Sequence, residues 1–374
     1  MRPASNSLLW ATLHCALFAS ALSGASSTDL SRDHLLFSRT PEGQIQPIRS
    51  PSEWKQRRAE ILSSMQEVMG PLPGPEKRCA LEVELVEEVD CGTYVRRLIR
   101  YQAEPGNRVP AYLLIPKKAL GGSAPAPGVL ALHQTHSEGQ KVVVGLGNSP
   151  DDEYGVELVK RGYVCLAPPY PMLANYWPDV KKLGWESGTM LGIWINIRGL
   201  DLLESLPFVK HGSYGSIGHS LGGHNGIYTA AFDERIHVVV SSCGLDSYRD
   251  YYDGDPKNWQ PERGWCQLRY MPRLASYGAR LSEIPFDFPE ILASIAPRRI
   301  FINAPLGDSN FRWRSVDRVA SVANEVFALW GEEMKITVVH PEGPHRFATE
   351  IRQQAYAVLE EVLRPPLKHD ARQG

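Results

Sequence analysis

The 374-residue chain carries 40 lysines and arginines against 42 aspartates and glutamates. The formal net charge of −2 therefore gives no reason to expect nucleic acid or an anionic membrane as its partner. With 43% hydrophobic and 22% charged residues it has the composition of an ordinary globular protein, and its 32 glycines and 29 prolines are too many for a helical bundle or a coiled coil. The length fits one large domain or two modest ones.

Residues 1–25 have the features of a secretory signal peptide. Arg2 supplies the positive charge, an apolar run follows over 8–22, and small residues stand at Ser23 and Ala25, where cleavage is expected. The alternative is an N-terminal anchor helix, but the apolar run is shorter than the roughly 20 residues needed to cross a bilayer. We expect a secreted or periplasmic protein.

Export places the remaining five cysteines in an oxidising compartment. Their odd number leaves at least one thiol free in a monomer. Cys243 and Cys266 could form a disulfide that ties a long insertion to the strand it leaves, or both could be free. None of the cysteines has the spacing of a zinc site, and we expect no metal.

The segment after the signal peptide, 26–78, is expected to be an N-terminal extension with a helix at 52–69, which Gly70 and Pro71 end. Three extended stretches follow at 81–89, 94–101 and 111–115, joined by short polar turns, and they predict an antiparallel meander. The meander opens a domain over 79–366, and 367–374 are a polar tail.

From residue 129 onward, short apolar runs alternate with amphipathic segments. The predicted strands are 129–133, 163–167, 214–217, 237–241, 300–303 and 335–339, and the predicted helices are 154–161, 189–206, 221–232, 316–330 and 347–363. This alternation predicts an α/β fold with a mostly parallel central sheet and helices on both faces. Functional side chains in such sheets lie at the carboxyl ends of the strands.

A possible nucleophile lies at one of those ends. Gly218-His219-Ser220-Leu221-Gly222 stands between a short strand and a helix, the context of a nucleophile elbow, whose turn is so tight that the flanking positions must be small. The alternative is a glycine-rich turn that merely packs the helix on the strand.

A serine needs a base and a carboxylate that orients the base. Asp308 follows the strand 300–303 and His345 follows the strand 335–339, in the chain order serine, aspartate, histidine. In the alternative interpretation Asp308 caps the next helix and His345 is an exposed loop residue. Asp246 is a rival for the acid, whereas His340 ends its strand too early to reach Ser220.

The backbone N–H groups that stabilise an oxyanion are expected from two places. Leu221, at the start of the helix after Ser220, provides one, and Gln134 or Thr135, after the strand ending at His133, provides the other.

Several segments of the sequence are similar to a known family. They are 188–194, 201–207, 217–225, 296–298 and 308–311, and together they resemble the α/β-hydrolase superfamily over about residues 80–363. Within it the chain is most similar to secreted hydrolases of the dienelactone-hydrolase and acetyl-xylan-esterase-like group. The resemblance implies the α/β-hydrolase fold and a catalytic triad of Ser220, Asp308 and His345. Dienelactone hydrolases themselves carry a cysteine where this chain has Ser220, and Arg346 replaces the family's usual aspartate.

About 40 residues, 245–284, interrupt the alternation of strands and helices. As a cap over the strand ends, this insertion would place aromatic rings and guanidinium groups beside Ser220, and the candidates for substrate binding are Trp259, Trp265, Tyr252 and Arg269. In the alternative interpretation these residues only pack the insertion against its own body.

These patterns predict a secreted serine esterase that forms an acyl-enzyme with a small or carbohydrate-linked ester, without a metal or organic cofactor. A peptidase or amidase on the same fold, and a binding module with a relic triad, are the alternatives.

Overall fold

The computed structural model describes residues 30–122, 124–278, 280–331 and 336–364. The predicted signal peptide, 1–25, and the predicted tail, 367–374, lie outside the described residues. Of the helices in the described part, none is long and apolar enough to cross a membrane.

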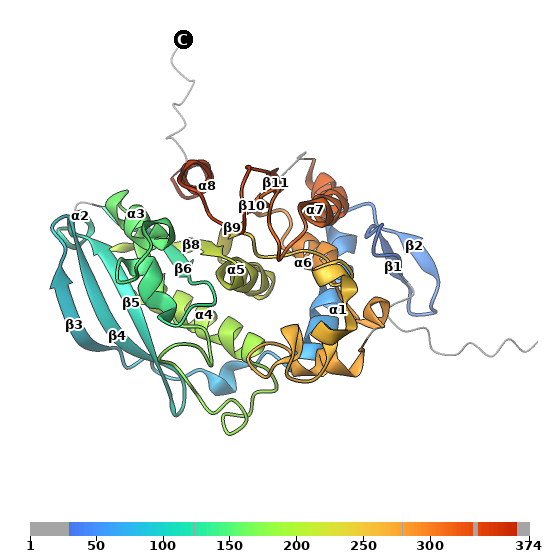
Figure 1. The fold of residues 1–374 in the computed structure, drawn as a ribbon, viewed down its shortest axis with the longest axis horizontal. Helices are drawn as coiled ribbons and strands as arrows, with labels where there is room; N and C mark the ends of the chain where they lie inside the picture. Colours follow the sequence, from blue (N-terminus) through green and yellow to red (C-terminus); the bar gives the residue numbers. More distant parts are fainter. Residues whose placement is uncertain (1–29, 123, 279, 332–335, 365–374) are drawn as a thin grey trace, which may run out of the picture.

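A single large sheet organises the described part of the chain (Figure 1). Its nine strands run in the order β11-β10-β9-β8-β6-β7-β5-β4-β3. They are β3 (Glu84–Asp90), β4 (Tyr94–Glu104), β5 (Asn107–Pro116), β6 (Ala126–Leu132), β7 (Val164–Ala167), β8 (Val209–His219), β9 (Ile236–Ser242), β10 (Arg299–Asn303) and β11 (Ile336–Val339). The six strands from β11 to β7 pair in parallel, and β5, β4 and β3 add an antiparallel meander. The predicted fold class is confirmed.

Helices cover both faces of this sheet (Figure 1). α4 (Gly188–Ser205), α5 (Leu221–Phe232), α6 (Phe288–Ala293) and α7 (Trp313–Phe327) share one hydrophobic core. α3 (Tyr154–Lys160) and α8 (Thr349–Leu363) share the core of the opposite face. β6 and β7, between these layers, are buried along their whole length, which explains why their sequences are short apolar runs.

The N-terminal extension packs on the α6 side. It contains the hairpin of β1 (Phe37–Arg39) and β2 (Ile45–Pro47), and then α1 (Pro51–Met69), close to the predicted helix. The Ser50 side chain caps α1 by accepting the Glu53 N–H, and Gly70 ends it with φ 88°. Arg57 of α1 forms a buried ion pair with Glu290 of α6 at 3.1 Å, so the extension is joined to the sheet domain by charge as well as by apolar contact.

Several element boundaries differ from the predictions. β8 begins at Val209, earlier than the predicted strand 214–217. The prediction missed its first half because that half includes the exposed Lys210 and His211, and polar residues leave no hydrophobic pattern from which a strand can be predicted. The predicted helix 316–330 is α7 followed by a separate 3₁₀ turn, Ala328–Trp330. Two short helices were not predicted, α2 (Lys117–Leu120) and α6, which is held by a capping box between Asp287 and Glu290.

The insertion 245–284 is built from 3₁₀ turns. They are η5 (Tyr251–Gly254), η6 (Pro256–Trp259), η7 (Gly264–Cys266), η8 (Pro272–Ser276) and η9 (Leu281–Glu283). Its large aromatic side chains form their own packed cluster, in which Tyr248 and Tyr251 both meet Trp259 edge to face. Cys243 and Cys266 are both free thiols, so no disulfide ties the insertion to β9.

Candidate active site

Ser220, Asp308 and His345 come together at the carboxyl ends of three parallel strands. Ser220 directly follows β8, while Asp308 and His345 stand in the loops after β10 and β11. Because β8, β9, β10 and β11 are neighbours that run in the same direction, those loops open at the same edge of the sheet.

Ser220 occupies a strained turn. Its backbone has φ 52° and ψ −121°, a conformation that non-glycine residues rarely adopt, and its N–H donates to the Ser242 carbonyl at 2.7 Å. The turn tolerates no larger residue beside it. A Cβ on Gly218 would stand 2.2 Å from the backbone carbon of Gly222, and one on Gly222 would stand 2.0 Å from the Leu132 carbonyl oxygen. These contacts explain the two glycines of the motif.

His345 and Asp308 form a direct pair. The Nδ1 of His345 lies 3.0 and 2.9 Å from the two carboxylate oxygens of Asp308, whose side chain is 1% exposed. The same carboxylate accepts the backbone N–H groups of Asn310 and Phe311 at 2.7 and 3.2 Å. Burial acts to raise the pKa of Asp308, but the hydrogen bond and charge of His345 and the two backbone donors outweigh it and lower the pKa. Asp308 is therefore ionised at neutral pH.

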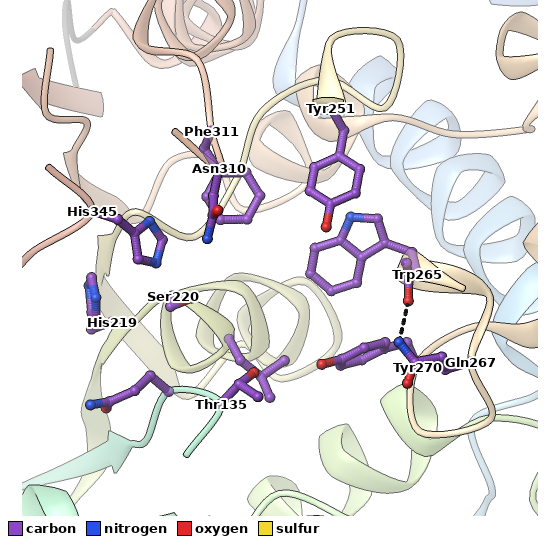
Figure 2. A pocket seen from close by; sticks show the side chains of 13 residues that line it. Thr135, His219, Ser220, Tyr251, Trp265, Gln267, Tyr270, Asn310, Phe311 and His345 are labelled. Atoms are coloured by element: carbon purple, nitrogen blue, oxygen red, sulfur yellow. Dashed lines mark hydrogen bonds between the residues drawn. The ribbon is translucent and has the colours of Figure 1, made fainter. Parts of the chain in front are cut away.

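Ser220 and His345 both line a cavity of about 340 Å³. Figure 2 shows Ser220, His219 and His345 on one side of this cavity. Among the described residues, no hydrogen bond joins the Ser220 hydroxyl to His345; without a substrate such a bond is often open and forms only in the complex. His219 packs against His345 with ring centroids 4.8 Å apart, and burial, with the charge of His345, lowers the pKa of His219 to about 3. His219 is therefore neutral near His345.

The two rival residues lie elsewhere. Asp246 is buried and accepts the backbone N–H of Arg312 at 3.1 Å through Oδ2. His340 is held between the Ala304 carbonyl and the Asp317 carboxylate, each at 2.8 Å from one of its ring nitrogens. Asp308 is thus the acid that contacts His345.

The residues predicted to stabilise an oxyanion also line the cavity. Leu221, at the first position of α5, and Gln134 and Thr135, in the loop after β6, all line it. In the described part of the chain, no acceptor is paired with the backbone N–H of Leu221 or of Thr135.

His133 fixes the orientation of that loop. Its Nε2 accepts the Tyr170 N–H at 2.9 Å, so its Nδ1 carries the proton that it donates to the Gln134 carbonyl at 2.7 Å. Burial lowers the pKa of His133 to about 4, which keeps the ring neutral in this role. Because a trans peptide directs its C=O and N–H to opposite sides, holding the Gln134 carbonyl also sets the direction of the Thr135 N–H.

Aromatic and amide side chains form the opposite wall of the cavity, where Figure 2 shows Trp265, Tyr270 and Gln267. Trp265 is backed by the fully buried His224, whose ring stacks on it at 4.3 Å with 10° between the planes. Gln267 is anchored by donating to the Gly264 carbonyl at 3.0 Å. None of the described residues that line the cavity is a lysine, arginine, aspartate or glutamate.

Of the four residues predicted to bind substrate, Trp265 lines the cavity. Trp259 is fully buried in the aromatic cluster of the insertion. Tyr252 is exposed and donates its hydroxyl to Asn310 at 3.0 Å, and Arg269 contributes its carbonyl to the Tyr170 hydroxyl at 2.9 Å. These three are not among the residues that line the cavity: Trp259 packs inside the insertion, whereas the Tyr252 hydroxyl is directed to Asn310 and Arg269 contacts Tyr170 through its backbone.

The prediction left out several residues that line the cavity: His219, Tyr251, Gln267, Tyr270, Asn310 and Phe311. Asn310 and Phe311 could have been predicted, because they follow Asp308 closely in the same loop after a strand end. Nothing in the sequence pattern separated Tyr270 from the other aromatic residues of the insertion, and nothing marked Gln267.

Comparisons with known proteins bear on the fold of the chain. No protein-family model matches the sequence. A protein of Bacillus subtilis (strain 168), named "Putative hydrolase YtaP", is 24% identical over 335 residues, which cover 82% of this chain and all of that protein. Among solved structures, the glucuronoyl esterase from Solibacter usitatus superposes with a TM-score of 0.69 at 19% identity, covering 88% of this chain and 97% of that one. A glucuronoyl esterase of carbohydrate esterase family 15 from Caldicellulosiruptor kristjansonii gives a TM-score of 0.64 at 18% identity, over 87% and 89%.

The chain therefore has the α/β-hydrolase fold, as the sequence resemblance implied. At sequence identities below 25%, the superpositions establish a shared fold and no shared activity. The chemistry therefore has to be argued from the residues at the strand ends.

Proposed function

We propose that this chain is a serine hydrolase that cleaves carboxylic esters attached to carbohydrates through an acyl-enzyme intermediate. One observation carries the proposal: His345, which contacts Asp308, lines the same cavity as Ser220, and Ser220 stands on a strained turn. A serine held clear of the backbone, a base and a buried carboxylate are the three parts that this chemistry needs.

In the first step the Ser220 hydroxyl attacks the ester carbonyl carbon while Nε2 of His345 takes its proton. Asp308 accepts the Nδ1–H of His345, which holds the ring in the tautomer whose Nε2 is free to act as a base and stabilises the positive ring that forms. The charge that develops on the carbonyl oxygen is stabilised by the N–H of Leu221 and by that of Thr135 or Gln134.

In the second step His345 returns the proton to the oxygen of the leaving alcohol, and the acyl group remains on Ser220. A water molecule, deprotonated by the same ring, then attacks the acyl carbon and releases the acid. Every proton transfer passes through His345, so no metal or organic cofactor is needed for this sequence.

The lining of the cavity favours a neutral substrate. A free carboxylate would be matched by an arginine or lysine, and none of the described residues lining the cavity is either. Aromatic faces such as Trp265 and amides such as Gln267 and Asn310 suit the apolar faces and hydroxyl groups of a sugar ring. An esterified uronic acid is uncharged at its carboxyl and meets this requirement, in agreement with the names of the glucuronoyl esterases that share the fold. Export by the predicted signal peptide would bring the enzyme to extracellular polysaccharide.

Replacing Ser220 with alanine tests the proposal. Ser220→Ala is expected to lower kcat/KM for p-nitrophenyl acetate by at least about 10⁴-fold, with an unchanged circular dichroism spectrum. Ser213→Ala, in the same strand but outside the cavity, is the matched control and should keep the activity. Activity that survives in Ser220→Ala would rule out the acyl-enzyme.

Two further assays separate the alternatives. A fluorophosphonate should label native Ser220 and fail on the denatured chain; absence of labelling would favour a binding module with a relic triad. A panel of acetylated, feruloylated and glucuronoyl esters beside peptide anilides should show turnover of the sugar esters, and preferential cleavage of the anilides would instead identify a peptidase or amidase.

A further inference from the structure

A buried thiol that the proposed reaction does not use lies beside the Asp308–His345 pair. The Sγ of Cys243, a carboxylate oxygen of Asp308 and a ring nitrogen of His345 all lie within 4.8 Å of one another. Cys243 directly follows β9, and Asp308 and His345 stand in the loops after the neighbouring parallel strands β10 and β11. The sequence alone gave no zinc-site spacing, because these ligand types meet only when the strands pair.

The Cys243 side chain is held there by its backbone rather than by strong bonds. Its φ is 50°, in the left-handed region, and the side chain is a free thiol with the residue 2% exposed. The contacts of its sulfur are long: the Ser242 hydroxyl at 3.7 Å, the Arg346 carbonyl at 3.8 Å and the Asn303 amide at 3.9 Å. Burial and the neighbouring Asp308 raise the pKa of this thiol, so it is protonated in the resting protein and does not compete with Ser220 as a nucleophile.

We propose that Cys243, Asp308 and His345 form an inhibitory site for a thiophilic divalent cation such as Zn²⁺. Thiolate, imidazole and carboxylate are the ligand types of zinc, with bonds of about 2.0 to 2.3 Å that place tetrahedral ligand atoms about 3.3 to 3.8 Å apart. Side-chain movements of about 1 Å would bring the three groups from their present separation to that geometry, with water as the fourth ligand. Magnesium and calcium prefer oxygen ligands and would not be held in this way.

Binding of the cation removes the base by changing the tautomer of His345. A cation on Nδ1 takes the place of the proton that Asp308 now accepts, and the neutral ring then carries its proton on Nε2. Nε2–H cannot accept the proton of Ser220. Cys243 loses its proton to solvent, Asp308 is already ionised, and the proton of His345 moves from one nitrogen to the other, so each bound ion releases one proton. This consequence rests on the proposed function, whereas the binding site itself does not.

The test uses the full chain after treatment with EDTA. Zn²⁺ should inhibit p-nitrophenyl acetate hydrolysis, EDTA should restore it, and Mg²⁺ at the same concentration should have no effect. In Cys243→Ser the concentration of Zn²⁺ for half inhibition, relative to that variant's own metal-free rate, should rise at least about tenfold. Cys266→Ser is the matched control, because Cys266 is also a buried free thiol but lies outside the cluster, and it should keep the sensitivity of the unmodified chain.

A second measurement is independent of activity. Cd²⁺ should give the ultraviolet absorption of a cadmium–thiolate bond with one equivalent per chain, and Cys243→Ser should abolish it; Cys243→Ala serves if the serine variant does not fold. Equal zinc sensitivity with and without Cys243, or no thiolate absorption in the unmodified chain, would overturn the proposal. A chain without esterase activity that still gives the Cys243-dependent absorption would refute the proposed function and leave the metal site supported.

Discussion

Exchanging the Asp308 carboxylate for an amide removes the group that orients the proposed base. Oδ1 accepts two backbone N–H groups, from Asn310 and Phe311, so the amide oxygen of Asp308→Asn should stay at that position. The NH₂ group then replaces Oδ2, 2.9 Å from His345 Nδ1, and only the amide oxygen, at 3.0 Å and already shared with the two backbone donors, is left as an acceptor for the ring. Because two N–H donors repel each other, the ring should move its proton to Nε2, where it can no longer accept the proton of Ser220.

The expected loss follows from that change of tautomer. We expect kcat for p-nitrophenyl acetate to fall by about 10³- to 10⁴-fold, which corresponds to about 4 to 5 kcal/mol in activation free energy. KM should change little because Asp308 is buried behind His345 and does not line the cavity. Thermal unfolding followed by circular dichroism checks that the variant is folded, since the two backbone hydrogen bonds remain possible.

Asp246→Asn is the matched control. Burial raises the pKa of Asp246 well above its ordinary value, and its acceptor bond to the Arg312 N–H can be made by an amide oxygen. Its kcat should therefore change by less than about tenfold. The opposite pattern, with Asp308→Asn nearly as active as the unmodified chain and Asp246→Asn inactive, would refute the assignment of the acid.

Two further predictions concern stability and substrate preference. Burial lowers the pKa values of His133, His219 and His224 from 6.5 to about 4, about 3 and about 3, so the unfolded chain takes up these protons first as the pH falls. The contribution of these neutral rings to the free energy of unfolding should be present in full above pH 6.5. Below that pH it should decline by up to about 1.4 kcal/mol per pH unit for each ring. Urea unfolding at pH 7 and pH 5 measures this loss, and in His224→Phe the free energy of unfolding should depend less steeply on pH. The same pH dependence in that variant would contradict a lowered pKa for His224. Trp265→Ala should raise KM for a carbohydrate ester roughly tenfold and barely affect p-nitrophenyl acetate. Trp177→Ala, at an exposed tryptophan outside the cavity, should alter neither, and equal losses of Trp265→Ala on both substrates would argue against a sugar platform.

Local sequence signals were sufficient for the architecture. Buried strands appear as short apolar runs and helices as amphipathic segments, since burial of backbone and side chains imposes these periods directly on the residues. The glycines around Ser220 were equally informative, because the contacts of Gly218 and Gly222 in the structure leave no room for a Cβ. The ends of helices and strands were predicted less well, because exposed residues such as Lys210 and His211 of β8 do not follow a hydrophobic pattern.

The details of the site depended on contacts between distant residues. Asp246 and Asp308 both follow strands of the same sheet, and their sequence environments do not decide which carboxylate meets His345; the pairing of β9, β10 and β11 does. The insertion shows the same limit, because its aromatic residues have similar surroundings in the sequence while Trp259 is buried and Trp265 lines the cavity.

The sequence by itself determined an α/β fold with a mostly parallel sheet and a serine on a tight turn, because those properties are encoded by periodicity and by glycines close to that serine; the α/β-hydrolase fold was what the family resemblance implied. Only the tertiary structure decided that Asp308 pairs with His345, that His133 orients the loop after β6, that the described residues lining the cavity include no lysine, arginine, aspartate or glutamate, and that Cys243 lies beside the pair. Each of these depends on residues from loops far apart in the sequence, which meet only when the strands pair and the insertion packs beside them, and no local pattern in the sequence records such contacts.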